Sequence, residues 1–171
     1  MLTPEQIDAL VASELDRLDI ALSVKPLVFG GLAMEHYGLR EHGHDIDLLI
    51  GADDLAALWA RFPEARKDMW GDLGLLVDGV EMFRSVYRLD AGFFGVGAVE
   101  YAHCRVMSAD RLLLMKWFAQ GGTPKNDRDL ELLKEHFFRS QNPAWEAYMQ
   151  GRVPRYLAAP GGTLLGAQID E

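Results

Sequence analysis

The 171 residues include 26 Asp or Glu and 17 Lys or Arg, so the formal net charge at neutral pH is −9. This balance argues against a general nucleic-acid binder, which needs a broad basic face to displace counterions from phosphates. The apolar share of 49% and the charged share of 25% are those of an ordinary globular protein. At this length one domain is the expectation. We predict that it covers residues 1–150, with a C-terminal tail over residues 151–171 that is disordered or forms an interface.

The N-terminal segment lacks both the basic and the apolar stretch of a secretory signal peptide, so we expect none. No apolar run approaches the ~20 residues of a membrane-spanning helix. Cys104 is the single cysteine, which excludes an intramolecular disulfide and fits a reducing compartment. Together these features predict a cytoplasmic protein that does not associate with a membrane.

The N-terminal half predicts helices and strands in alternation. Thr3, Pro4 and Gln6 have the pattern of a capping box with proline at the first helical position, so a helix is expected from there to about Leu18. Leu27–Phe29 is an apolar run that predicts a short buried strand ending at two glycines. The later expectations are a helix over residues 32–37 closed by Gly38, a strand over residues 44–50, and a helix through residues 56–59 begun by Asp53 or Asp54.

The C-terminal half predicts a hairpin and then further helices. Asp78-Gly79 between two apolar runs is a strong signal for a two-residue hairpin turn. Ser108 is the expected cap of a helix that ends at about Ala119. The remaining expectations are a strand over residues 99–106, a helix opened by Thr123-Pro124 or by Asn126-Asp127, and a short helix around residues 145–149. The order predicts an α/β (α+β) fold, with a mixed sheet flanked by helices and with C-terminal helices.

Asp45 and Asp47 lie two positions apart in a segment that predicts a strand. Residues two apart in a strand share a face, so both carboxylates project together. Two like charges at that separation repel, which either raises a pKa or calls for a cation between them. Mg²⁺ typically takes one or two carboxylates together with substrate phosphates, so the pair predicts a magnesium site. The alternative interpretation is a solvated strand end.

Gly30 and Gly31 stand between the strand predicted at Leu27–Phe29 and the following helix. A missing side chain there lets the backbone approach a ligand closely. The amide groups at the start of a helix favour an anion such as phosphate. One element is therefore expected to hold phosphate and the next strand its metal ion, although a glycine pair is also common in simple turns.

Phe29-Gly30-Gly31, followed after thirteen residues by Asp45-Ile46-Asp47, resembles the signature of the nucleotidyltransferase superfamily that includes DNA polymerase beta. Gly38-Leu39-Arg40 also resembles the Gly-x-x-Arg of small members, although it has one residue between glycine and arginine where that pattern has two. These include minimal and antibiotic nucleotidyltransferases and the transferase toxins of abortive-infection systems. The resemblance covers roughly residues 20–135 and implies a nucleotidyltransferase-like mixed sheet.

The resemblance also implies a third carboxylate on a following strand, which completes a site for two Mg²⁺ ions with Asp45 and Asp47. Glu81 is the best match, and Asp78 is the rival. The catalytic and metal-binding set expected from the resemblance is thus Asp45, Asp47 and Glu81.

Lys116 lies among apolar residues of a predicted helix, at positions that turn it toward the core. An unpaired ammonium group there is costly, and a phosphate or carboxylate would compensate for it. Asp127 is a candidate partner, while a snorkelling lysine is the alternative. By resemblance Lys116 contacts the triphosphate, so the expected nucleotide-binding residues are Gly30, Gly31, Arg40 and Lys116.

The implied reaction transfers a nucleoside monophosphate from an NTP such as ATP to an acceptor hydroxyl and releases pyrophosphate. The acceptor class stays open between a small molecule, a protein side chain and an RNA end, and so does assembly as a homodimer or with a partner protein. Two other hypotheses are a non-catalytic or regulatory protein of the same fold, such as a toxin–antitoxin component, and a partner-binding domain in which the aspartate pair is incidental.

Overall fold

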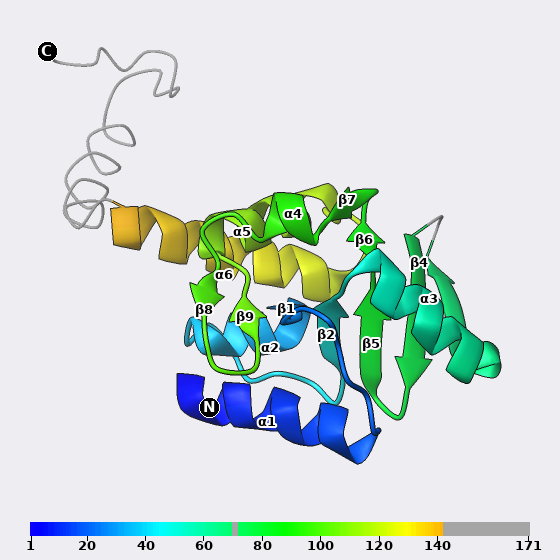
Figure 1. The fold of residues 1–171 in the computed structure, drawn as a ribbon. Helices are drawn as coiled ribbons and strands as arrows, with labels where there is room; N and C mark the ends of the chain where they lie inside the picture. Colours follow the sequence, from blue (N-terminus) through cyan, green and yellow to red (C-terminus); the bar gives the residue numbers. More distant parts are fainter. Residues whose placement is uncertain (70–71, 142–171) are drawn as a thin grey trace, which may run out of the picture. The chain divides into compact units, whose positions relative to one another are not determined.

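The computed structural model describes residues 1–69 and 72–141 (Figure 1). Within these residues it has six α-helices and a mixed sheet, which confirms the expected α/β class. The chain divides into two units, residues 1–133 and residues 134–171. The tail predicted over residues 151–171 and the short helix predicted around residues 145–149 lie outside the described residues. None of the described helices has the length and apolar character needed to cross a membrane.

The helices are α1 (Pro4–Arg17), α2 (Gly30–His36), α3 (Ala52–Arg61), α4 (Ala91–Phe94), α5 (Ala109–Phe118) and α6 (Pro124–Gln141), with a 3₁₀ turn at Pro63–Ala65. The strands are β1 (Leu27–Phe29), β2 (Ile46–Leu49), β3 (Arg66–Met69), β4 (Asp72–Val77), β5 (Val80–Phe83), β6 (Ser85–Val86), β7 (Leu89–Asp90), β8 (Val99–Glu100) and β9 (Arg105–Val106).

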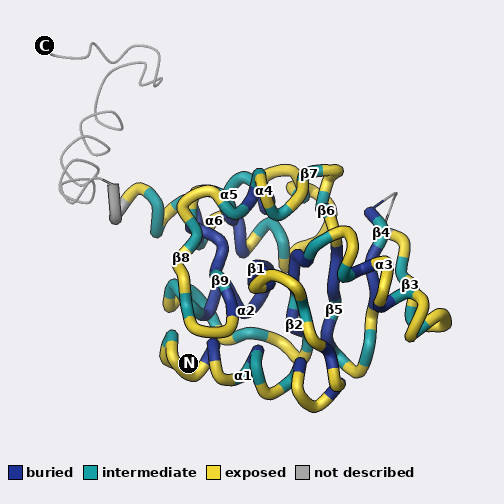
Figure 2. The backbone as a smooth tube through the Cα atoms, in the orientation of Figure 1, coloured by how far each residue is buried: buried dark blue, intermediate teal, exposed yellow. Residues whose placement is uncertain are grey.

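The main sheet of the described residues has the strand order β3-β4-β5-β2-β1-β9-β8. Strand β2 pairs antiparallel with β1 and parallel with β5, while β1 pairs parallel with β9. Figure 2 shows that buried residues concentrate on these central strands. Because β2 is paired with a strand on each side, its polar residues lie in the interior of the sheet and not on an edge strand.

The capping box at the start of α1 is confirmed. The Thr3 hydroxyl accepts the Gln6 N–H, and the Gln6 side chain accepts the Thr3 N–H at 2.8 Å. Residues at helical spacing then bury one face of α1, including Ile7 and Val11. This apolar stripe follows the 3.6-residue period, and its residues belong to the hydrophobic core.

The hairpin predicted at Asp78-Gly79 is also confirmed, because β4 and β5 pair antiparallel around two residues with positive φ. Of the two predicted starts of the helix that follows α5, Thr123-Pro124 is correct, because α6 begins at Pro124. The cap predicted for α3 is wrong. Gly51 occupies that position, and the Asp54 carboxylate instead accepts hydrogen bonds from Ser23.

The single strand expected over residues 99–106 is two short strands, β8 and β9, paired antiparallel. A turn separates them, closed by the Tyr101 N–H donating to the Cys104 carbonyl at 2.9 Å. The Cys104 N–H and the neighbouring His103 N–H donate to the buried Asp8 carboxylate of α1. This carboxylate satisfies backbone donors that a continuous strand would have paired in the sheet.

Candidate active site

Gly30 and Gly31 are the first two residues of α2, directly after β1. Gly30 has φ +60°, and a Cβ added there would lie 1.9 Å from Oδ2 of Asp47. Only glycine fits this position, because any side chain would overlap the carboxylate as well as strain the backbone. The glycine backbone, which we expected to lie close to a ligand, therefore also lies close to the Asp47 carboxylate. The Gly31 N–H donates a hydrogen bond to this carboxylate.

The sheet register brings Asp47 and Glu81 together. In the parallel pair of β2 with β5, Asp47 stands directly opposite Glu81. Residues opposite each other on adjacent strands share a face, and Asp45 lies two positions earlier along the chain. Burial, then the charges of Asp45 and Glu81, raise the pKa of Asp47 from 3.8 to about 6, against the opposing effects of Lys116 and the Gly31 N–H.

The structure separates the two candidates for the third carboxylate. The Glu81 charge acts on Asp47, and its side chain is only 15% exposed. The Asp78 side chain is 73% exposed at the β4–β5 turn and pairs with Arg17 at 3.5 Å. Glu81 also accepts a hydrogen bond from Lys67 Nζ of β3 at 2.7 Å. The third acid that shares the face of Asp47 is thus already engaged by a lysine.

Lys116 and Arg40 converge on one buried acid, Asp129. Arg40 donates through Nε and Nη2 to the two carboxylate oxygens at 2.6 and 2.8 Å. Lys116 Nζ lies 2.9 Å from Oδ2 of the same group, whose side chain is 1% exposed. Burial raises the pKa of Asp129, but the hydrogen bonds from Arg40 and Lys116 outweigh it and hold the pKa below its usual value.

This network corrects one expectation from the sequence. The acid beside Lys116 is Asp129, which lies two residues after Asp127 in α6. Asp127 instead accepts the N–H of Gly121 at 2.8 Å, which ties the loop before α6. Lys116 also donates to the side-chain oxygen of Asn126 at 3.1 Å. The lysine is buried, as the apolar helix pattern indicated.

Both cations also act on the aspartate pair. The charges of Asp45 and Asp47 contribute to the raised pKa of Arg40, after the larger effect of its hydrogen bonds with Asp129. Lys116 lowers the pKa of Asp47. The residues predicted as nucleotide-binding and those predicted as metal-binding therefore lie within electrostatic reach of one another.

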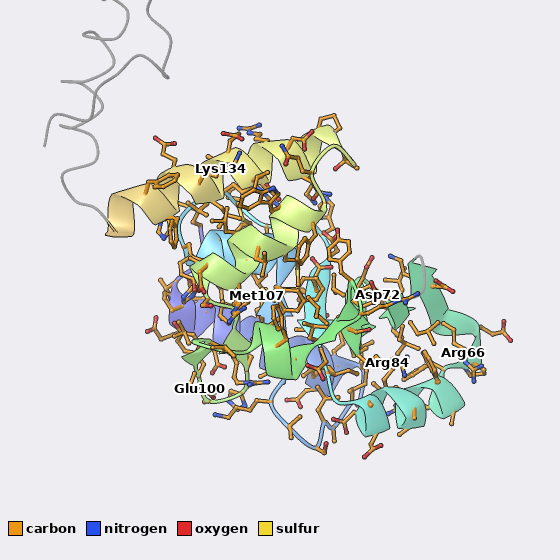
Figure 3. All side chains as sticks on the ribbon, turned by 90° about the horizontal axis from the view of Figure 1, so that it is seen from above. Arg66, Asp72, Arg84, Glu100, Met107 and Lys134 are labelled. Atoms are coloured by element: carbon orange, nitrogen blue, oxygen red, sulfur yellow. The ribbon has the colours of Figure 1, made fainter. Side chains whose placement is uncertain are left out.

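A small cleft of about 90 Å³ opens beside the acids and has features that the sequence did not suggest. Tyr87 lies at this cleft and meets Phe118 of α5 edge to face, with ring centroids 5.6 Å apart. Asp72, which Figure 3 labels, is buried, and its carboxylate accepts the Ser85 hydroxyl and the Arg88 N–H. The cleft is lined by Phe29, Asp47, Asp72, Glu81, Phe83, Val86 and Tyr87.

The donor set at Asp45 and Asp47 fits a hard divalent cation. Burial raises the pKa of Asp47 most, and the charges of Asp45 and Glu81 raise it further; a dication would neutralise that negative charge. Among the residues that the structure describes, no group of three or more His, Cys, Asp or Glu side chains is arranged to hold a metal ion. Two carboxylates are enough for Mg²⁺ when substrate phosphates supply the other ligands. The role of Glu81 as a third ligand stays a prediction.

In comparisons with known proteins, no family model matches the sequence, and neither a curated protein nor a solved structure is found to match it. The functional argument therefore depends on the motifs and on the geometry described above.

Proposed function

We propose that the protein is a metal-dependent nucleotidyltransferase of the polymerase-beta type, which moves a nucleoside monophosphate from an NTP to an acceptor hydroxyl and releases pyrophosphate. The observation that supports it most is the convergence of three separate sequence features. The glycine pair, the neighbouring acids Asp45 and Glu81, and the Lys116–Arg40 cation pair all interact with one carboxylate, Asp47.

Asp45 and Asp47 would hold Mg²⁺, with Glu81 as the expected third ligand. When bound, the metal lowers the pKa of the acceptor hydroxyl and neutralises charge on the phosphates. The chain's own contribution is positioning and fixed charge. Gly30 and Gly31 bring backbone next to the acids without a side chain between them.

Lys116 and Arg40 are the cations that would face the triphosphate. Because Asp129 fixes both head groups, little side-chain freedom remains to be lost when a phosphate binds. Phosphoryl-transfer catalysis consists largely of such positioning and electrostatic stabilisation. Asp129 is therefore a positioning residue, since it acts on phosphate only through the two cations.

The test is incubation of the full chain with each α-labelled NTP and Mg²⁺, with and without cell extract as the source of acceptor. We expect labelled product and released pyrophosphate from the native protein. Asp45→Asn and Asp47→Asn are expected to abolish both while the proteins stay folded. Asp53→Asn, an exposed acid in the first turn of α3, is the matched control and is expected to keep full activity. Full activity in either active-site variant refutes the mechanism.

The Lys67–Glu81 ion pair favours a second candidate, a protein of this fold that binds nucleotide without catalysis. In that case Mg²⁺–NTP raises the thermal unfolding temperature, because a ligand of the folded state stabilises it, but no label is transferred. A thermal shift without any product from extract selects this candidate over the enzyme.

A further inference from the structure

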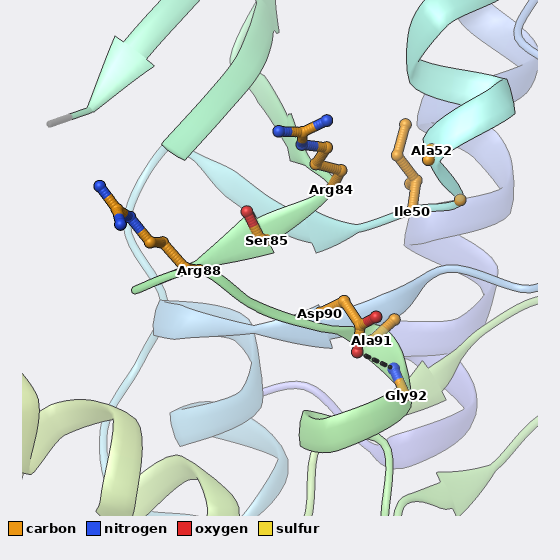
Figure 4. Close-up of a pocket in the computed structure, with 9 residues that line it drawn as sticks. Ile50, Ala52, Arg84, Ser85, Arg88, Asp90, Ala91 and Gly92 are labelled. Atoms are coloured by element: carbon orange, nitrogen blue, oxygen red, sulfur yellow. Dashed lines mark hydrogen bonds between the residues drawn. The ribbon is translucent and has the colours of Figure 1, made fainter. Parts of the chain in front are cut away.

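A second cavity, of about 680 Å³, is lined by none of the carboxylates of the candidate active site (Figure 4). Its volume is in the range of small-molecule sites. Segments from three places in the sequence line it, namely the end of β2 with the start of α3, the end of β5, and the hairpin with the start of α4. The lining residues are Ile50, Gly51, Ala52, Arg84, Ser85, Arg88, Asp90, Ala91 and Gly92.

Arg84 and Arg88 line this cavity, and neither guanidinium group is paired with an acid that the structure describes. Neither side chain forms an ion pair or a hydrogen bond with any residue in the described part of the chain. Figure 4 shows the two side chains extending from either side of Ser85.

Asp90 is the one acidic side chain that lines this cavity, and its carboxylate is already used. Its Oδ1 accepts the N–H groups of Gly92 and Phe93 at 2.9 and 3.1 Å, which caps α4. Figure 4 shows the bond to Gly92 at the other end of the lining from the arginines. Asp90 therefore caps the helix and forms no ion pair with either guanidinium group, although its negative charge remains in the lining.

The backbone of the hairpin is strained to present Arg88. Tyr87 and Arg88 have φ of 53° and 63°, a conformation that favours glycine, asparagine or aspartate. The buried Asp72 holds both residues there by accepting their N–H groups. Such strain persists where the surroundings over-determine it and clusters at functional positions. The turn directs Tyr87 to the carboxylate cleft and Arg88 to the second cavity.

We propose that this cavity binds a phosphate-bearing small molecule through Arg84 and Arg88. The planar guanidinium group matches phosphate oxygens in pairs, and two such groups accommodate a mono- or diphosphate. The site is separate from the carboxylates and needs no metal. Its occupancy is thus independent of whether the protein transfers nucleotides.

The test is titration of the full chain with inorganic pyrophosphate in EDTA at low salt, followed by calorimetry. EDTA removes divalent cations, so Asp45, Asp47 and Glu81 repel pyrophosphate at the carboxylate site, and the Lys116 variant below reports any binding to the cations there. We expect one binding site. Arg84→Gln and Arg88→Gln are each expected to weaken binding at least about tenfold, the loss typical of a charge-assisted hydrogen bond. Both residues are exposed, so we expect the variants to have the same thermal unfolding temperature as the native protein.

Two control variants make the result decisive. Arg66→Gln removes an equal charge from an exposed arginine of β3 outside the cavity, and we expect binding to be unchanged. Lys116→Gln alters the carboxylate site, and binding in EDTA is again expected to persist. The proposal is wrong if native protein binds no pyrophosphate, if Arg66→Gln weakens binding as much as Arg84→Gln, or if only Lys116→Gln abolishes it.

Discussion

The carboxylate of Asp47 is expected to cost the metal-free protein stability at neutral pH. Its pKa is about 6 in the folded state against 3.8 for the ordinary side chain. The unfolded chain therefore releases this proton at lower pH than the folded chain does, so stability falls as pH rises from about 4 to about 6. This difference in pKa lowers the free energy of unfolding by about 3 kcal/mol above that pH range and does not change it below the range.

Asp47→Asn removes the charge and keeps a side-chain oxygen for the Gly31 N–H. We expect the free energy of unfolding at about pH 7.5 to increase by about 1 to 3 kcal/mol, because relaxation around the charge recovers part of the penalty. Near pH 4 the gain is expected to disappear. The measurement is urea unfolding of both proteins at the two pH values in EDTA.

Asp53→Asn serves as the control, since its side chain is on an exposed first turn of α3, and no gain is expected there. Equal or lower stability of Asp47→Asn at about pH 7.5 refutes the electrostatic reasoning. So does a gain of the same size at both pH values, because a packing effect does not depend on proton binding.

Three further variants probe the supports of the site, each by urea unfolding. Gly30→Ala is expected to destabilise the fold by more than about 2 kcal/mol, whereas Gly38→Ala, also at positive φ but with open space around it, is expected to cost only about 1 kcal/mol. Similar losses contradict the steric argument. Asp129→Asn leaves two cations without their acid and is expected to cost about 3 to 5 kcal/mol, while Asp127→Asn is expected to cost less than about 1.5 kcal/mol. The reverse order excludes the proposed network. Asp72→Ala frees two backbone donors of the strained turn and is expected to cost about 2 to 4 kcal/mol. An unchanged midpoint shows that the turn is not held by this acid.

The local elements were predictable where one residue type carries a strong backbone preference. The capping box at Thr3, the Asp78-Gly79 turn and the glycine after α2 all hold because a side-chain oxygen or a positive φ acts within a few residues. Asp47 lies in β2 as the strand pattern predicted, whereas Asp45 lies one residue before the strand begins.

What could not be predicted depends on contacts between distant segments. The β6–β7 hairpin turns at Tyr87 and Arg88, which carry no turn signal, because a remote carboxylate at Asp72 holds their N–H groups. The choice of Asp129 over Asp127 as the partner of Lys116 depends on how α6 is rotated against α5, which spacing alone does not determine. The ion pair of Glu81 with Lys67 is likewise set by the order of strands in the sheet.

The two ends of the main sheet limit how copies of this chain can associate. At one end, β3 begins Arg66-Lys67-Asp68, and such charged residues discourage the addition of a further strand. At the other end, β8 is only two residues long, too short to template pairing. Dimerisation by extending this sheet across an edge is therefore unfavourable, and a second copy or partner would have to dock through side chains on another surface.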